Sequence, residues 1–388
     1  MTNRIAILGS TGSIGTSALE VIEHLGPPCR VAALSAHRQL DRLVEQATRH
    51  RPTAVAVTSE DVSPAIATQL RKLDIALYAG PAAMIDLVRR DDVDTVLVAV
   101  VGAAALPAVL AAVEAGKRVA LANKEALVVA GSLLMPLARQ KGVTLFPVDS
   151  EHSAVFQACR CGRAHEIRRV ILTASGGPFR NASREQLENA TLADALKHPT
   201  WRMGAKITID SATMFNKALE IIEAHWLFDL PPEKIEVVVH PESVVHSMVE
   251  FVDGSVIAQL SPPDMKTPIQ YALTYPDRLP GITRKLDLTK PTSLHFEPPD
   301  MKRFPALKLA YRAIQLGGAA GAVLNAANEA AVQAFTSGKI RFPEICRLVE
   351  TIIDERRFQP APSLDDLLEA DHWARNRVES LVSDTRPG

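Results

Sequence analysis

Two carboxylates near the middle of the chain could hold a metal ion. Asp149 and Glu151 stand two residues apart, directly after the apolar run Thr144–Val148. Side chains alternate along an extended strand, so both carboxylates can point the same way. Hard oxygen ligands of this kind suit Mg²⁺ or Mn²⁺. Taken alone, however, the stretch favours a helix cap, because Asp, Ser and Glu are common in the first turn of a helix.

A second group of polar residues lies further along, in Asp210–Glu220. The stretch begins like a capped helix and continues with apolar periodicity to Phe228. Asn216 and Glu220 are four residues apart and share a helix face, while Lys217 lies on the adjoining face. One interpretation is a site for charged ligands. The other is an ion pair on a solvated face, worth about 0.2–0.5 kcal/mol.

Two loops could complete such a site. Ser175 follows an apolar run and is followed by two glycines, which could form an anion nest or a simple loop. The stretch Lys197–Lys206 contains Trp201 and Met203 without clear periodicity. It could be a lid that excludes water, or a corner anchored by one buried tryptophan.

The first third of the chain predicts a dinucleotide-binding domain. The strand-like run Arg4–Leu8 is followed by the glycine-rich segment Gly9–Gly15 and the helical pattern Ser17–Leu25. A strand, a glycine turn and a helix N-terminus together can cradle a pyrophosphate. The glycine spacing is G-x-x-G-x-x-G rather than G-x-G-x-x-G, but its place after the first strand favours a nucleotide turn over a plain tight turn.

The end of the next strand indicates the choice of cofactor. The run Arg30–Leu34 leads into His37, Arg38 and Gln39, where an NAD-specific domain usually has an acidic residue. Arg38 could accept a 2′-phosphate, which favours NADP(H). The alternative is a solvated loop arginine.

Further strands place Lys124 at a ligand-binding edge. The runs Ala54–Val57, Thr95–Val101 and Arg118–Ala122 are separated by helical lengths, as in a parallel, doubly wound sheet. The last of them delivers Lys124 at its C-terminal end, where open α/β sheets bind ligands. A lysine there could contact a substrate oxygen or form a surface salt bridge with Glu125.

The remaining pattern completes the expected architecture. Lys234–Leu260 alternates around a turn and predicts a meander of antiparallel strands, prolines punctuate Tyr275–Lys302, and helical periodicity follows Pro305. We expect an α/β protein with a Rossmann-like doubly wound domain over 1–148 and a central α+β catalytic domain with antiparallel strands over 149–274. An extended linker over 275–303 and a C-terminal helical bundle over 304–388 follow.

The composition argues against several classes of partner. The 388 residues carry a formal net charge of -1, which gives no electrostatic reason to expect nucleic acid or a membrane surface. The longest apolar runs are broken by Asp, Gly and Pro and do not resemble a membrane span. Four cysteines at unrelated spacings and the polar start of the chain predict a cytoplasmic protein.

The motifs in combination resemble the 1-deoxy-D-xylulose 5-phosphate reductoisomerase family of the non-mevalonate isoprenoid pathway. The resemblance covers nearly the whole chain, and the ordered set is far more specific than a glycine turn. Its segments are Gly9–Gly15, Asn123–Glu125, Val148–His152, Thr173–Phe179, His198–Gly204, Asp210–Glu220, His240–Met248, Gln259–Met265 and Leu324–Glu329.

This resemblance implies a two-stage reaction on one site. A Mg²⁺ or Mn²⁺ ion, held by the residues matching Asp149, Glu151 and Glu220, promotes a rearrangement of the phosphorylated sugar, and NADPH then reduces the resulting aldehyde. The expected catalytic residues are these three together with Lys124. The resemblance also implies a homodimer, which agrees with an antiparallel sheet that can extend across a two-fold axis.

The resemblance assigns the other site residues by position. The expected cofactor contacts are Thr11, Gly12, Ser13, Ile14, His37, Arg38, Gln39, Asn123, Glu125 and Gly204. The expected substrate contacts are Lys124, Ser150, Glu151, Ser175, His198, Ser211, Asn216, Lys217 and Glu220, most of the later ones around the phosphate. Trp201 and Met203 match the closing loop. Ala36–Gln39 departs from the Gly-Lys-Asn-like residues that related sequences often carry at the 2′-phosphate position.

Two other functions fit the scaffold. A related reductase of another phosphorylated sugar or aldehyde would skip the rearrangement and would be expected to change the metal ligands or the lid. A nucleotide-sensing protein without catalysis should have lost a carboxylate or Lys124. The sequence keeps all of these residues, so we favour the NADP- and metal-dependent reductoisomerase.

Overall fold

The chain forms two compact units in the computed structural model, which describes residues 2–201, 203–355 and 357–384. The first unit contains the described residues up to 126, together with 134–153 and 264–285. The second contains 127–133, 154–263 and the described residues from 286 onward. The domain boundaries expected from the sequence remain a prediction.

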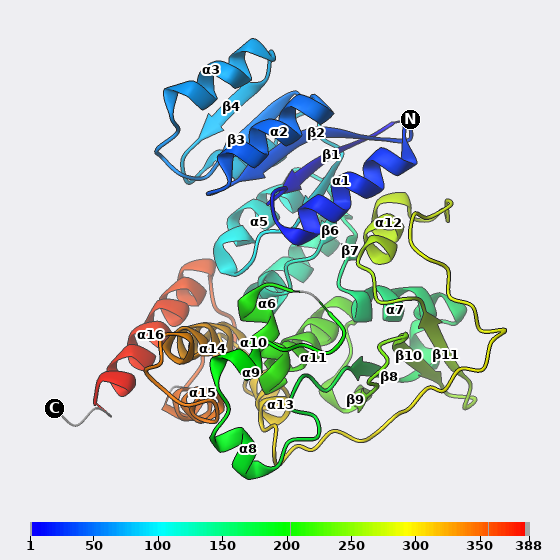
Figure 1. The fold of residues 1–388 in the computed structure, drawn as a ribbon, viewed down its shortest axis with the longest axis vertical. Helices are drawn as coiled ribbons and strands as arrows, with labels where there is room; N and C mark the ends of the chain where they lie inside the picture. The colour runs from blue at the N-terminus through cyan, green and yellow to red at the C-terminus, as the bar shows by residue number, and fades with distance from the viewer. Residues whose placement is uncertain (1, 202, 356, 385–388) are drawn as a thin grey trace. The chain divides into compact units, whose positions relative to one another are not determined.

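A parallel sheet forms the centre of the first unit (Figure 1). Its strands are β1 (Asn3–Leu8), β2 (Cys29–Ala36), β3 (Ala54–Val57), β4 (Ala76–Ala79), β5 (Thr95–Val98), β6 (Arg118–Leu121) and β7 (Leu145–Pro147). The helices of this part of the chain are α1 (Ser13–Leu25), α2 (Leu40–His50), α3 (Pro64–Lys72), α4 (Ala83–Val88), α5 (Leu106–Glu114), α6 (Glu125–Lys141), α7 (Ser150–Ala158) and α12 (Lys266–Thr274). A 3₁₀ turn, η1 (Ala103–Ala105), precedes α5.

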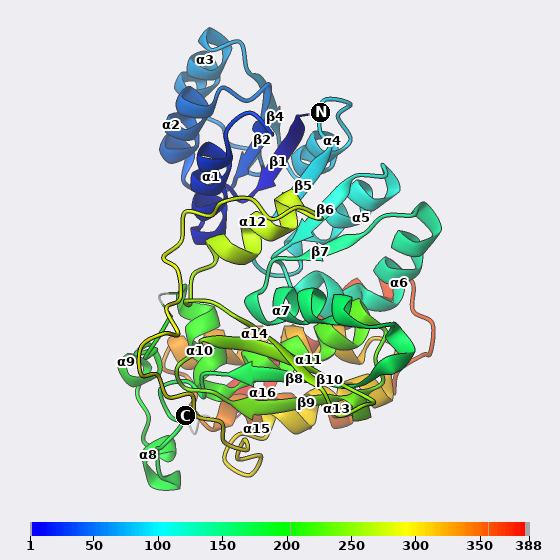
Figure 2. The same cartoon turned by 90° about the vertical axis from the view of Figure 1, so that its right-hand side faces the viewer.

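The strand order confirms the doubly wound fold. It runs β4-β3-β2-β1-β5-β6-β7, and each neighbouring pair is parallel. Figure 2 shows α1 and α2 on one side of the strands and α4 and α5 on the other. The strands are therefore buried on both faces, which explains their continuous apolar runs. The order reverses between β1 and β5, which is where open α/β sheets bind nucleotides.

The edge strand β4 was not foreseen from the sequence. Its residues, Ala76–Ala79, are partly exposed, unlike the fully buried β3 beside it. A short strand at an edge needs no buried apolar face, so it leaves little hydrophobic signal.

The second unit combines a four-stranded sheet with helices. Its strands are β8 (Ile167–Ala174), β9 (Ile235–Val239), β10 (Val245–Phe251) and β11 (Val256–Leu260). Its helices are α8 (Arg184–Glu188), α9 (Leu192–Ala195), α10 (Ala205–Thr213), α11 (Phe215–Phe228), α13 (Ala306–Leu316), α14 (Ala320–Thr336), α15 (Glu344–Glu355) and α16 (Leu364–Asp384). The 3₁₀ turns are η2 (Cys159–Cys161), η3 (Ala164–Glu166) and η4 (Pro232–Lys234).

The predicted antiparallel meander is correct for β10 and β11 and wrong for β9. The order is β11-β10-β8-β9: β10 pairs antiparallel with both β11 and β8, whereas β9 pairs parallel with β8. The segment 240–244 therefore crosses past β8 instead of forming a hairpin. Sequence alternation predicts strands but does not reveal which strand lies between two others.

The single helix predicted to start at Asp210 is wrong. Asp210 lies in the last turn of α10, and Met214 then breaks the chain direction with a left-handed backbone (φ 64°) before α11 begins. Most residues avoid this conformation, so apolar periodicity across the break gives no warning of it. Two helices that meet at one residue replace the expected one.

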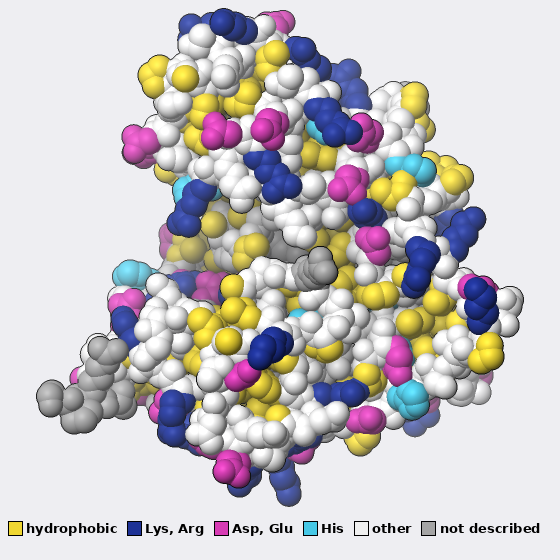
Figure 3. Space-filling view, viewed as in Figure 1, with side chains coloured by type: hydrophobic (Ala, Val, Ile, Leu, Met, Phe, Trp, Pro, Cys, Tyr) yellow, Lys and Arg dark blue, Asp and Glu magenta, His cyan; other side chains and the backbone are white. Residues whose placement is uncertain are grey.

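The C-terminal helices agree with the sequence prediction. Helices α13 to α16 fill the region after Pro305 for which a helical bundle was predicted, and they form the orange to red part of Figure 1. Before them, residues 276–304 form no helix and no strand except one bridge, between Val239 and Glu297. No helix among the described residues is long and apolar enough to cross a membrane. Acidic and basic side chains are interspersed over the face drawn in Figure 3.

Candidate active site

The glycine turn after β1 leaves a helix N-terminus open. A Cβ on Gly15 would meet the carbonyl oxygen of Gly9 at 2.4 Å, so α1 can pack this closely against the turn because Gly15 has no side chain. Gly9 has a φ of 81°, and a Cβ there would lie 2.9 Å from the Ala99 carbonyl oxygen, beyond β5. No side chain caps the N-terminus of α1 at Gly12. Backbone N–H groups at such a terminus attract a phosphate.

The predicted 2′-phosphate loop lies beyond β2. His37, Arg38 and Gln39 are all exposed, and the His37 imidazole Nδ1 lies 2.9 Å from Thr58 Oγ1. The loop carries no acidic side chain between Ser35 and Gln39. An exposed guanidinium without a neighbouring carboxylate in its loop fits a phosphate better than a ribose hydroxyl.

Asn123 ties two strand ends together. Its amide nitrogen donates to the carbonyl oxygens of Val100 (2.8 Å) and Gly102 (2.9 Å) and to the carboxylate of Glu125 (2.9 Å). Its amide oxygen accepts from the N–H of Ala126 at 2.9 Å. The side chain is thus committed to shaping the edge of the sheet from which Lys124 projects.

Lys124 and Asp149 form a buried ion pair. The ammonium lies 2.6 Å from Asp149 Oδ2, and the two side chains are 7% and 12% exposed. Burial alone would raise the pKa of Asp149, but the charges of Lys124 and His152 hold it well below the usual range. The carboxylate is therefore anionic at neutral pH and offers oxygen ligands of full charge.

The stretch after β7 is both a helix start and an acidic cluster. Asp149 precedes α7, and its carbonyl oxygen accepts from the N–H of Ser153 at 2.8 Å. The hydroxyl of Ser150 donates to Glu151 Oε2 at 2.6 Å, which keeps that carboxylate beside the helix start. The two interpretations of this stretch, a helix cap and a pair of metal-binding carboxylates, are therefore compatible.

In the second unit, the loop after β8 presents a serine hydroxyl. Ser175 Oγ accepts from the N–H of Gly177 at 3.2 Å and lies 3.0 Å from Nε2 of His198. Gly176 and Gly177 both have left-handed backbones, with φ of 82° and 65°. These glycines let the backbone fold back under the serine.

His198 is held in one tautomer. Its Nδ1 accepts from the N–H groups of Thr200 (3.1 Å) and Trp201 (2.8 Å), so Nε2 carries the proton and donates to Ser175 Oγ. Burial lowers the pKa of His198. The ring is therefore a neutral hydrogen-bond donor at neutral pH, and it links the Ser175 loop to the predicted lid.

The start of α11 carries a second buried ion pair. Lys217 Nζ contacts Glu220 Oε2, and the side chains are 4% and 1% exposed. The amide of Asn216 donates to the other oxygen of the same carboxylate. The structure thus brings the three predicted residues of this helix together and excludes the alternative of a solvated face.

The predicted lid lies in a segment without helix or strand. Trp201 and Met203 are half-buried, and Arg202 between them lies outside the described residues. The Trp201 ring packs at 6.4 Å from that of His246, measured between centroids. Gly204 is exposed and precedes α10, whose N-terminus has no side-chain cap.

Sequence reasoning did not single out His246 as a site residue. It is buried on β10, its Nε2 lies 2.9 Å from Ser261 Oγ, and burial lowers its pKa to about 4. A lone histidine in a β-strand pattern gives no signal for a contact with a distant tryptophan.

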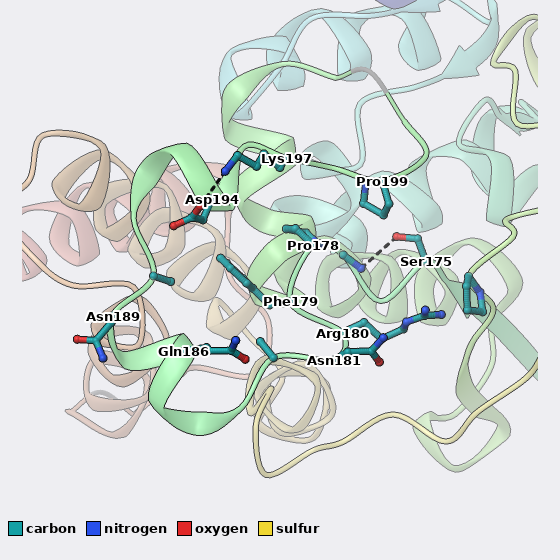
Figure 4. Close-up of a pocket in the computed structure, with 14 residues that line it drawn as sticks. Ser175, Pro178, Phe179, Arg180, Asn181, Gln186, Asn189, Asp194, Lys197 and Pro199 are labelled. Carbon is teal, nitrogen blue, oxygen red and sulfur yellow. Dashed lines mark hydrogen bonds and ion pairs between the residues drawn. The ribbon is translucent and has the colours of Figure 1, made fainter.

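A cavity of about 690 Å³ adjoins the Ser175 loop (Figure 4). It is lined by Ser175, Gly177 and Pro178 on one side and by polar side chains of the segment 180–197 on the other. In Figure 4, Lys197 pairs with Asp194 at the rim, at 2.9 Å. Apart from Lys197, these polar residues show no periodicity and belong to no recognised motif, so the sequence did not predict that they line a cavity.

Three family profiles match the chain. The profile described as 1-deoxy-D-xylulose 5-phosphate reductoisomerase matches residues 5–131, and that of its C-terminal domain matches 145–228. A third, the DXP reductoisomerase C-terminal domain, matches residues 260–377. Together they cover most of the chain in order.

Two curated relatives carry the name 1-deoxy-D-xylulose 5-phosphate reductoisomerase. The protein of Geotalea daltonii is 50% identical over 378 residues, which cover 97% of this chain and 98% of the relative. That of Symbiobacterium thermophilum is 51% identical over 384 residues, with coverage of 97% and 98%.

Solved structures agree with these relatives. The reductoisomerase of Zymomonas mobilis in complex with NADPH has a TM-score of 0.93 and 43% identity, covering 98% of this chain and 99% of its own. A reductoisomerase in complex with NADPH, fosmidomycin and magnesium has a TM-score of 0.93 and 41% identity, covering 98% of both chains. The chain described here belongs to the 1-deoxy-D-xylulose 5-phosphate reductoisomerase family.

Proposed function

We infer that this chain catalyses the NADPH-dependent conversion of 1-deoxy-D-xylulose 5-phosphate to 2-C-methyl-D-erythritol 4-phosphate, the reaction of its family. One observation on the residues of this chain supports the inference. Its two buried ion pairs, Lys124–Asp149 and Lys217–Glu220, lie in the segments that the family motifs cover. Buried ionisable groups with specific charge partners cluster at functional sites.

We propose that Asp149, Glu151 and Glu220 hold a divalent metal ion. A relative was solved with magnesium, and Mn²⁺ has the same preference for oxygen ligands. The donor set fits, because all three groups are carboxylates and two of them already attract a cation, the ammonium of Lys124 or Lys217.

We propose that the open N-terminus of α1 receives the pyrophosphate of NADPH. The contacts would come from Thr11 to Ile14, with the 2′-phosphate at His37, Arg38 and Gln39. The close packing of Gly15 on Gly9 supports this assignment, since a side chain at Gly15 would disrupt the turn. Asn123, Glu125 and Gly204 would complete the cofactor contacts.

We propose that the substrate phosphate binds in the second unit. Ser175 and His198 already form a hydrogen-bonded pair at the end of β8. Ser211 lies in the last turn of α10, and Asn216 and Lys217 lie in the first turn of α11, whose N-terminus has no side-chain cap. Hydroxyls, a neutral imidazole donor, an ammonium and an uncapped helix start are the groups that phosphate dianions favour.

The residues divide the chemistry between them. When bound, the metal ion supplies a Lewis acid for the substrate oxygens, and NADPH supplies the hydride. The Lys124 ammonium is placed to stabilise negative charge that develops on an oxygen at the reacting end, beside Ser150. Trp201 and Met203 would close over the substrate and exclude water from it.

We propose that the chain acts as a homodimer in the cytoplasm. Strand β11 is an edge of its sheet; its first residue, Val256, is 49% exposed, and Val252 in the preceding turn is 67% exposed. An uncovered edge with exposed valines is suited to pairing with a second copy. All four cysteines are free thiols, as expected of a reducing compartment.

The direct test mixes the protein with 1-deoxy-D-xylulose 5-phosphate, NADPH and Mg²⁺ and follows cofactor oxidation at 340 nm. We expect turnover that requires the metal and that stops with EDTA. Product analysis by mass spectrometry should show the rearranged, branched skeleton. A reduced product with an unrearranged skeleton would indicate the related reductase instead.

Glu220→Gln should separate metal-dependent chemistry from folding. The amide keeps the size of the side chain but removes one anionic ligand, so we expect turnover to fall by at least about 100-fold. NADPH affinity should change little and the variant should still fold, but its melting temperature should fall, because the buried Lys217 ammonium loses its charged partner. Glu233→Gln, an exposed change in the same unit, is the matched control. Unchanged turnover of Glu220→Gln at limiting Mn²⁺ would contradict the three-carboxylate assignment.

Arg38→Ala should change the choice between cofactors. A charge-assisted hydrogen bond to the 2′-phosphate is worth about 1.5–3 kcal/mol, so NADPH should bind roughly 10- to 100-fold more weakly, while NADH binding should stay the same. Fluorescence titration with both cofactors measures the difference. Arg71→Ala, also an exposed arginine of the first unit, should affect neither. Equal losses for the two cofactors would place the 2′-phosphate elsewhere.

The dimer can be measured by light scattering. We expect a molar mass twice that of the single chain. Val256→Lys should shift the population toward monomer, because a charged side chain on an edge strand opposes pairing. Leu288→Lys, at another exposed apolar position of the second unit, should leave the mass unchanged. A monomeric parent protein would refute the proposed dimer.

A further inference from the structure

A third buried carboxylate lies in α10, immediately before Ser211. Asp210 is 1% exposed. Its Oδ2 is 2.6 Å from the ammonium of Lys206, one helical turn earlier. Its Oδ1 accepts a hydrogen bond of 2.9 Å from the amide nitrogen of Asn328, which lies on α14. This carboxylate has no place among the proposed metal, cofactor or substrate contacts.

Each carboxylate oxygen of Asp210 has its own partner. A buried carboxylate is costly unless it is paired and hydrogen-bonded, and each of its oxygens has a partner on a different element or turn. Asn328 is completely buried, and its amide oxygen has no hydrogen-bond partner among the described atoms. A flipped amide would turn that oxygen toward the carboxylate and repel it, so the observed orientation is fixed by Asp210.

Helix α14 is a firm anchor for this contact. A Cβ on Gly321 would meet the carbonyl oxygen of Val128 at 2.1 Å, so α14 lies directly against the start of α6. One residue after Asn328, Glu329 accepts from Arg375 of α16 at 2.7 Å. The helix is thus held by α6 and by α16, and Asp210 couples α10 to it.

The end of α10 in turn determines the position of the Ser175 loop. A Cβ on Gly177 would meet the carbonyl oxygen of Ser211 at 2.6 Å, so that loop rests on the backbone of α10. The N–H of Gly177 also donates to the hydroxyl of Ser175. A shift of α10 would therefore move Ser211 directly and Ser175 through Gly177.

We propose that Asp210, held by Asn328 and Lys206, is the positioning residue for the phosphate-binding groups of this site. It does not touch the substrate. It fixes α10 against the C-terminal helices, so that the hydroxyls of Ser175 and Ser211 keep one separation. The inference rests on the proposed function, because that function assigns both serines to the substrate phosphate.

The test exchanges the two side chains. Asp210→Asn removes the charge beside Lys206, and Asn328→Asp places a second carboxylate against Asp210. The reciprocal double variant restores one carboxylate, one amide and a hydrogen bond between them. Asp354→Asn breaks an exposed ion pair with Arg312 in the same unit and is the matched control.

We expect each single variant to raise the KM for 1-deoxy-D-xylulose 5-phosphate by about tenfold or more, with a smaller change in kcat and an unchanged KM for NADPH. The double variant should recover part of the loss, because the hydrogen bond between positions 210 and 328 returns while the ion pair with Lys206 does not, and Asp354→Asn should behave like the parent. A residue that only supports folding would lower the amount of active protein, and thus kcat, without changing the KM for one substrate alone.

Binding of inorganic phosphate gives a readout that does not depend on turnover. Calorimetric titration of the full chain should show weaker phosphate binding in both single variants and recovery in the double variant. This holds even if the chain acts on a different phosphorylated substrate, so failure of the proposed function would be distinguishable. Should a single variant not fold, the double variant decides. Phosphate affinity equal to the parent in Asp210→Asn, or no recovery in a folded double variant, would overturn the proposal.

Discussion

A buried carboxylate is costly without a cation, and the candidate site and its surroundings are arranged around that cost. Three of the acidic side chains withdrawn from water each have a lysine ammonium within contact distance. The pairs are Asp149 with Lys124, Glu220 with Lys217, and Asp210 with Lys206. Removing an unpaired carboxylate from water would destabilise the folded state by roughly several kcal/mol. The lysines are therefore as necessary for folding as they are useful for chemistry.

This pairing allows the site to exist without its ligands. The Lys124 and Lys217 ammonium groups neutralise carboxylates that we assign to the metal, so the unliganded chain does not bury uncompensated charge. If a divalent cation shared the same oxygens, as we propose, the ammonium groups would become available to anionic parts of the substrate. The residues that balance the charge of the carboxylates would then also meet the negative charge that develops in the reaction.

The sequence predicted most of the scaffold because its signals are local. The glycine turn, the buried strands and the C-terminal helices each follow from a run of neighbouring residues, and Lys124 was placed by the simple rule that parallel strands deliver ligands at their carboxyl ends. The place of β9 beside β8 depends on a pairing across more than 60 residues, and alternation does not encode it. The contact of Asn328 with Asp210 spans 118 residues, so the two motifs gave no sign of each other.

The backbone at Met214 adopts a conformation that its residue type disfavours. A left-handed backbone costs a residue other than glycine about 1–2 kcal/mol, and Met214 is buried in that conformation. The break follows Thr213, the last residue of α10, and α11 starts at once, which places Asn216 and Lys217 in a new first turn. A continuous helix would have no terminus at this position. The strained residue therefore marks a helix start inside a stretch whose apolar periodicity predicts an unbroken helix, and periodicity alone does not reveal it.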